Sequence, residues 1–108
     1  MISKTILVIG TYDTKDDELR FLASVIRSQG GNVVTMDVSV LGNPSNPCDY
    51  SKHDVTGEGG NSIEMASASG NENTAMQIMA KGAALLASRL YEERKFDGMI
   101  ILGGTMGT

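Results

Sequence analysis

Three runs of β-branched and aliphatic residues constrain the fold of this chain more than any other feature. They occupy residues 5–10, 32–38 and 96–102, and within them apolar residues mostly follow one another instead of alternating with polar ones. Strands of that kind are covered on both faces, as in the parallel sheets of α/β proteins. The sequence therefore predicts three buried parallel strands.

A helix is predicted between the first two strands, over residues 15–29. We expect Thr14 to cap this helix, with Asp17 as the capping-box partner, because the two residues have the required spacing. Gly30 and Gly31 follow, and glycine readily adopts the left-handed conformation that ends many helices. One face of the helix is apolar and consists of Leu19, Leu22, Ala23 and Ile26.

A longer helix is predicted over residues 72–94, packed on the sheet. We assign Met76 and Met79 to its core-facing side rather than to an adaptable binding surface, because methionine more often fills irregular space in cores. The residues between the second strand and this helix, 41–70, contain both prolines and predict a long connection, with a short helical signal at Ser51 and Asp54. Such a connection is either a lid or interface, or a surface excursion without chemical role.

These elements predict an α/β fold in which the first strand lies between the other two. The result is a three-layer sandwich with a short parallel sheet in the order 2-1-3, a Rossmann-like arrangement. The third strand runs into a glycine-rich turn, residues 103–108, without the helix that usually follows. We therefore interpret residues 1–108 as an N-terminal α/β subdomain of a larger protein, truncated after the third strand.

The composition excludes several classes of function. The chain has 108 residues and a formal net charge of −4, which argues against direct binding of nucleic acid. Its apolar runs are shorter than the ~20 residues that a membrane-spanning helix needs, so we expect a cytoplasmic protein without membrane contact. One cysteine and one histidine make a structural zinc site improbable. We also expect the protein to form a homo-oligomer.

Polar and glycine residues follow each of the three strands, where ligands bind in parallel α/β sheets. We expect the three turns to share one crevice, because the carboxyl ends of parallel strands meet at one edge of the sheet. The candidate ligand-binding residues are Gly10, Thr11, Asp13, Thr14, Lys15, Asp37, Gly103, Gly104, Thr105, Gly107 and Thr108. No catalytic residue and no metal ligand set can be assigned.

The first turn, residues 10–15, lies at the N-terminus of the first predicted helix. It matches neither the dinucleotide-binding fingerprint nor the Walker A loop, so neither motif is claimed. Its hydroxyls, the Asp13 carboxylate and the Lys15 ammonium are suited to a ribose, a phosphate or Mg²⁺. The alternative is that Thr14 is only a helix cap and Asp13 only a turn residue.

Asp37 ends the second strand, where dinucleotide-binding folds place an acidic residue that accepts hydrogen bonds from ribose hydroxyls. The alternative interpretation is a turn aspartate that accepts hydrogen bonds from nearby backbone N–H groups.

The turn after the third strand is the strongest signal for an anion. Gly103, Gly104 and Gly107 permit positive φ and a close approach of the main chain, and successive N–H groups in such a turn form an anion-binding nest. Thr105 and Thr108 add hydroxyl donors. The alternative is a tight turn that serves only the packing of strand against helix.

Several short motifs together resemble one known family. Residues 10–15, G-T-Y-D-T-K, resemble the G-T-x-D-T-K opening of the Tm-1-like ATP-binding family, also called UPF0261, which includes a plant inhibitor of tobamovirus RNA replication. The segments 38–42, 81–84 and 96–98 and the final glycine-rich turn are similar to further motifs of that family, in the same order. The resemblance covers essentially the whole chain.

The resemblance implies binding of ATP, with or without Mg²⁺, in a cleft between this part and a second α/β half of the same protein. The turn formed by Gly103, Gly104, Thr105, Gly107 and Thr108 would then lie near the phosphates, beside residues 13–15. Thr105 and Met106 stand where the family usually has serine and glycine. If φ at Met106 must be positive, its side chain costs about 1 kcal/mol or more.

Three functions remain open at this stage. The first is an ATP-binding subdomain that works with an absent second half. The second is part of a metabolic enzyme acting on a phosphorylated or carboxylated small molecule, with Asp13 or Asp37 as acid, base or Mg²⁺ ligand. The third is an interaction protein like the plant relative, with residues 41–70 contacting a partner. Neither the reaction nor hydrolysis of ATP follows from the sequence.

Overall fold

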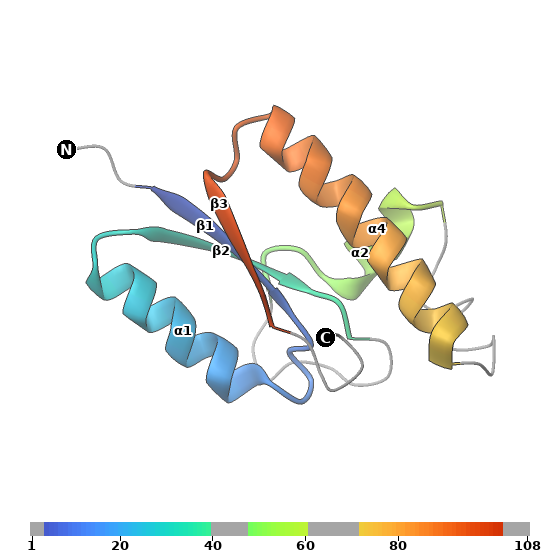
Figure 1. Ribbon diagram of the computed structural model, residues 1–108, viewed down its shortest axis with the longest axis horizontal. Coiled ribbons are helices and arrows are strands. Elements are labelled where there is room, and N and C mark those ends of the chain that lie inside the picture. The colour runs from blue at the N-terminus through green and yellow to red at the C-terminus, as the bar shows by residue number, and fades with distance from the viewer. Residues whose placement is uncertain (1–3, 40–47, 61–71, 103–108) are drawn as a thin grey trace.

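The computed structural model describes residues 4–39, 48–60 and 72–102, and these form an α/β fold (Figure 1). Three parallel strands form one sheet in the order β2-β1-β3, which confirms the predicted order 2-1-3. The elements in chain order are β1 (Thr5–Gly10), α1 (Asp16–Ser28), β2 (Asn32–Asp37), α2 (Lys52–Glu58), α4 (Glu72–Glu92) and β3 (Gly98–Leu102). The final turn, residues 103–108, lies outside the described residues.

The helices cover the two faces of the sheet, with α1 on one side and α2 and α4 on the other (Figure 1). Successive residues of β1 point to opposite faces. Leu7 and Ile9 therefore join the cluster beneath α4, whereas Val8 packs with Tyr12 and Leu19 beneath α1. The three β1 side chains are at most 4% exposed. Each such burial stabilises the fold by about 1.5–3 kcal/mol, so β1 is the centre of both cores.

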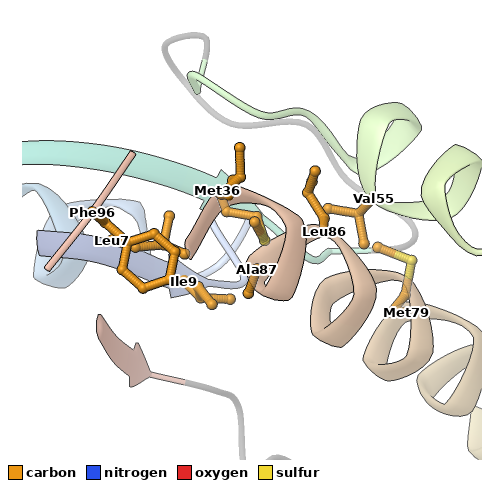
Figure 2. Close-up of a cluster of buried hydrophobic side chains, with 9 residues drawn as sticks. Leu7, Ile9, Met36, Val55, Met79, Leu86, Ala87 and Phe96 are labelled. Carbon is orange, nitrogen blue, oxygen red and sulfur yellow. The ribbon is translucent and has the colours of Figure 1, made fainter. Parts of the chain in front are cut away.

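Figure 2 shows the larger of these two cores, which forms between the sheet and helices α2 and α4. Met79 belongs to it, as predicted, and is 3% exposed. Met76 is half-buried. The core consists of Leu7, Ile9, Met36, Val55, Met79, Leu86, Ala87, Leu90 and Phe96.

Helix α1 confirms the predicted apolar face but not the predicted cap. Its N-cap residue is Lys15, and no side chain accepts a hydrogen bond there. The prediction for Thr14 was wrong because the chain first makes a turn in which the carbonyl oxygen of Thr11 accepts hydrogen bonds from the N–H groups of Thr14 and Lys15. That extra turn moves the start of the helix one residue past the expected position.

Helix α1 ends at the predicted glycines. Gly30 has a φ of +88°, and its N–H donates to the carbonyl oxygen of Arg27 at 3.0 Å. The N–H of Gly31 donates to the carbonyl oxygen of Ile26 at 3.0 Å. This pair of bonds is the Schellman motif, which satisfies carbonyl groups that the helix leaves open.

The predicted long connection is folded where the structure describes it, in residues 48–60. Tyr50 forms a bridge to Met36 along the outer edge of β2, and the Asp49 carboxylate accepts hydrogen bonds from the N–H and hydroxyl of Thr35. Ser51 and Asp54 form the expected capping box of α2. Local capping and pairing with β2 therefore order this part of the connection, and the helical signal predicted at Ser51 and Asp54 is confirmed.

Gly82 allows α4 to approach α2 closely. A Cβ atom built at Gly82 would lie 2.1 Å from the carbonyl oxygen of Val55, which is far inside van der Waals contact. Glycine costs a helix interior about 0.8–1.0 kcal/mol relative to alanine. The close packing of α2 on α4 offsets this cost.

We predict that Gly82→Ala lowers the free energy of unfolding by about 1–3 kcal/mol, because the helices must separate to admit the methyl group. The matched control is Gly57→Ala in α2, where a Cβ atom would meet nothing within 4 Å. That substitution is expected to raise the free energy of unfolding by up to about 1 kcal/mol, from helix propensity alone. Urea denaturation measures both, and equal effects of the two substitutions would contradict the close contact.

Candidate functional site

The carboxyl ends of the three strands meet at one edge of the sheet. The register pairs Gly10 with Asp37 on one side and with Leu102 on the other. The chain runs from β1 to β2 in one direction and then crosses β1 to reach β3 on the opposite side. Ligands of open α/β sheets bind at such a reversal, which here lies between the ends of β1 and β3.

The turn after β1 brings two hydroxyl groups together. The Oγ1 atoms of Thr11 and Thr14 are 3.3 Å apart, and either can be the donor. Thr14 is exposed, whereas Thr11, Asp13 and Lys15 are half-buried. The structure therefore brings these four predicted site residues into one short loop at the start of α1.

The electrostatics of this loop are mixed. Asp16, Asp17 and Glu18 occupy the first turn of α1, where carboxylates interact favourably with the positive end of the helix dipole. Asp16 also pairs with Arg20, whose Nε atom lies 3.1 Å from Asp16 Oδ1. Because these carboxylates repel a bare phosphate, the N-terminus of α1 needs Lys15 or a bound cation to attract one.

Gly10 has a packing role that is independent of any ligand. A Cβ atom at this position would lie 2.6 Å from the carbonyl oxygen of Leu102 and 2.7 Å from Cδ1 of Leu19. Glycine thus lets both β3 and α1 approach the end of β1. Its part in ligand binding stays a prediction.

The Asp37 carboxylate holds the turns after β1 and β2 together. Its Oδ1 accepts hydrogen bonds from the N–H of Tyr12 at 3.2 Å, the N–H of Ser39 at 3.0 Å and the Ser39 hydroxyl at 2.7 Å. Asp37 is 1% exposed. These contacts agree with the interpretation of a turn aspartate that binds backbone N–H groups, and a hydrogen bond to ribose stays a prediction.

Tyr12 is a component of this region that the sequence reasoning missed. Its side chain is fully buried, and its hydroxyl donates to the carbonyl oxygen of Val8 at 3.0 Å. The guanidinium of Arg20 lies 5.0 Å from the centre of the ring, within the range of a cation–π interaction. Tyr12 stands at the variable position of the G-T-x-D-T-K pattern, so nothing in the motif indicated that it would be buried.

Cys48 packs against the cluster that Val8, Tyr12 and Leu19 form beneath α1. Its Sγ atom lies 3.8 Å from Nη2 of Arg20. Burial and the nearby Asp37 carboxylate raise the pKa of the Cys48 thiol, and Arg20 opposes that shift only in part. A raised pKa disfavours the thiolate, so Cys48 is not activated as a nucleophile.

The five residues predicted in the glycine-rich turn, Gly103, Gly104, Thr105, Gly107 and Thr108, lie outside the described residues, as does Met106. Within residues 4–39, 48–60 and 72–102, no group of three or more His, Cys, Asp or Glu side chains could hold a metal ion. None of the helices in this described part is long and apolar enough to cross a membrane.

Residues 4–108 match the family described as "Uncharacterised protein family (UPF0261) N-terminal domain". The chain belongs to the UPF0261 family. A UPF0261 protein of Brucella suis biovar 1 is 51% identical over 106 residues, which are 98% of this chain and 25% of that protein. A UPF0261 protein of Clostridium tetani is 36% identical over 107 residues, which are 99% of this chain and 26% of that protein.

The chain thus spans about a quarter of the length of these relatives. No solved structure is significantly similar to it. The family and the N-terminal position agree with the resemblance seen in the sequence motifs, whereas the names of the relatives state no ligand and no reaction.

We predict that Asp37→Ala lowers the free energy of unfolding by at least about 2 kcal/mol, because buried donors lose their acceptor. Asp37→Asn keeps an oxygen that can accept at the same place and should cost less than half as much. Chemical denaturation of both variants at neutral pH measures the difference. Equal losses in the two variants would show that the charge, and not the acceptor geometry, holds these turns.

Burial also raises the pKa of Tyr12 above its ordinary value, with Cys48 and Asp37 adding to the shift and Arg20 opposing it. Its contribution to stability is therefore complete below the ordinary tyrosine pKa of about 10 and is lost as the pH rises above that value. We predict that Tyr12→Phe removes part of the alkaline loss of stability. The exposed Tyr91 provides the control Tyr91→Phe, which should leave the alkaline profile unchanged.

This expectation is tested by unfolding free energies measured between pH 7 and pH 11, a range that spans the ordinary tyrosine pKa of about 10. An alkaline profile that Tyr12→Phe leaves unchanged would contradict the assignment to Tyr12.

Proposed function

We propose that this UPF0261 domain is the nucleotide-binding N-terminal part of a larger protein and that its ligand is ATP with Mg²⁺. The observation that carries the proposal is the strand order β2-β1-β3. It puts the reversal of the sheet between the ends of β1 and β3, where flavodoxin-like and dinucleotide-binding folds bind their ligands. The turn at residues 10–15 borders this point, and β3 leads toward it through Leu102.

The residues of the first turn have the chemistry that a phosphate requires. The Thr11 and Thr14 hydroxyls are neighbours that can donate hydrogen bonds, and Lys15 adds a positive charge at the start of α1. In the proposed site, backbone N–H groups of Gly103, Gly104 and Gly107 complete the phosphate contacts, assisted by Thr105 and Thr108. The motif resemblance supports this second half of the site.

The charge distribution favours a phosphate that carries a metal ion. Three carboxylates line the first turn of α1, and the chain has a net charge of −4. A triphosphate without Mg²⁺ would meet repulsion from all of them. Mg²⁺ is commonly held by one or two carboxylates together with substrate phosphates, so a carboxylate of this turn and the triphosphate could hold it jointly.

The whole site is expected to need the second half of the protein. The chain covers only 25% of the relative from Brucella suis, and the motif resemblance implies a cleft between two α/β parts. The natural polypeptide is therefore the right sample for a binding experiment. Its reaction and its homo-oligomeric state are further proposals that the same sample can address.

We predict that the natural polypeptide binds Mg²⁺–ATP and that Lys15→Gln weakens binding at least about tenfold, or 1.4 kcal/mol. Lys4→Gln is the charge-matched control, because Lys4 is exposed and precedes the amino-terminal end of β1, at the other end of the strand from the proposed site. Gly104→Val should weaken binding by a similar factor, since a side chain there would intrude on the nest. Isothermal titration calorimetry measures all four proteins.

Thermal unfolding without nucleotide establishes that each variant is folded before titration. Removal of Mg²⁺ with a chelator should reduce affinity, because the acidic turn then repels the triphosphate. A folded natural protein that gives no heat with Mg²⁺–ATP, or equal affinities for Lys15→Gln and Lys4→Gln, would overturn the proposed site.

A further inference from the structure

Strand β3 is the least covered part of the sheet. Met99, Ile100, Ile101 and Leu102 are 50%, 39%, 60% and 36% exposed. The equivalent side chains of β1 are at most 4% exposed. Since β3 is paired only with β1 among the described strands, its other edge presents backbone N–H and C=O groups that can pair with a further strand.

The register assigns the exposed side chains to the two faces of the sheet. Met99 and Ile101 pair with Leu7 and Ile9. They therefore lie on the face of the sheet where α4 packs over β1 and β2. Ile100 pairs with Val8 and therefore lies on the α1 face, together with Leu102. Apolar residues on both faces are typical of an inner strand of a parallel sheet, covered by helices on each side. We call Met99, Ile100, Ile101 and Leu102 together the β3 surface.

We infer that the β3 surface is covered by polypeptide that follows Thr108 in the natural protein. A fourth strand pairs in parallel with the free edge of β3, and the helix that precedes this strand packs over Met99 and Ile101. A later segment covers Ile100 and Leu102 on the α1 face of β3. The inference does not depend on nucleotide binding.

The handedness of the crossovers selects the face for the next helix. The connection from β2 to β3 carries α4, and α4 lies on the face opposite α1 (Figure 1). A right-handed crossover that continues in the same direction, from β3 to a strand beyond it, must place its helix on that same face. The Met99 and Ile101 side chains are therefore the ones that the next helix meets.

The length of the relatives indicates which polypeptide covers the β3 surface. About three quarters of the Brucella suis protein lies outside the match to this chain. The match to the family extends to residue 108, just after β3. A chain that continues from this position can pair a further parallel strand with the free edge of β3 after a single helical crossover, which takes about a dozen or more residues, whereas a second copy would have to bring a matching edge of its own.

Thiol labelling of the natural polypeptide tests the inference. Ile101→Cys and Ile100→Cys report on the two faces of β3, and Ser88→Cys on the exposed side of α4 is the matched control. We expect the thiols introduced at positions 100 and 101 to react with a maleimide at least about tenfold more slowly than the thiol at position 88, because burial requires local opening before reaction. The unsubstituted protein supplies the background from native cysteines.

Analytical ultracentrifugation of the same samples separates the two possible occupants. Protection at positions 100 and 101 that persists in a monomer supports coverage by the same chain. Protection that disappears when a dimer dissociates on dilution overturns the inference in favour of a second copy. Labelling as fast as at position 88, in a variant whose thermal unfolding is unchanged, overturns it as well.

Discussion

Burial of both faces of strand β1 is the constraint on which the rest of this structure depends. Leu7 and Ile9 point to one helical layer and Val8 to the other, and all three are almost inaccessible to water. Two layers of helices require crossovers on opposite faces, and right-handed crossovers on opposite faces run in opposite directions along the sheet. The order β2-β1-β3, and with it the reversal of the sheet between the ends of β1 and β3, follows from that requirement.

The candidate site therefore shares its supports with the core. Gly10 lets α1 and β3 converge on the end of β1, and Asp37 joins the following turn to the end of β2 through hydrogen bonds to Tyr12 and Ser39. A loop held in this way keeps the Thr11 hydroxyl and the start of α1 in place without a ligand. The acidic first turn of α1 adds negative charge beside this loop, and that charge repels a phosphate that lacks a cation.

Much of the fold was predictable because its signals are local. The aliphatic runs, the capping box of α2 and the glycines after α1 each act within a few residues, and the structure confirms them. Thr14 was assigned wrongly because the two possible start positions of the helix differ by only one residue, and the turn closed by the carbonyl oxygen of Thr11 selects the later one. The ordered segment 48–60 was underestimated because its pairing with β2 joins residues distant in sequence.

The sequence by itself determined the family and the α/β class, since periodicity and short motifs encode these within single elements. It also predicted the strand order, with the help of general rules for the layers and connections of α/β folds. In addition, it named the turn at residues 10–15 as a candidate site. Only the tertiary structure decided that Tyr12 is buried beside Cys48, that the Asp37 carboxylate binds the neighbouring turns, and that α4 needs Gly82 to approach α2. These features depend on distances between separate elements, and such distances are set when the layers pack around β1.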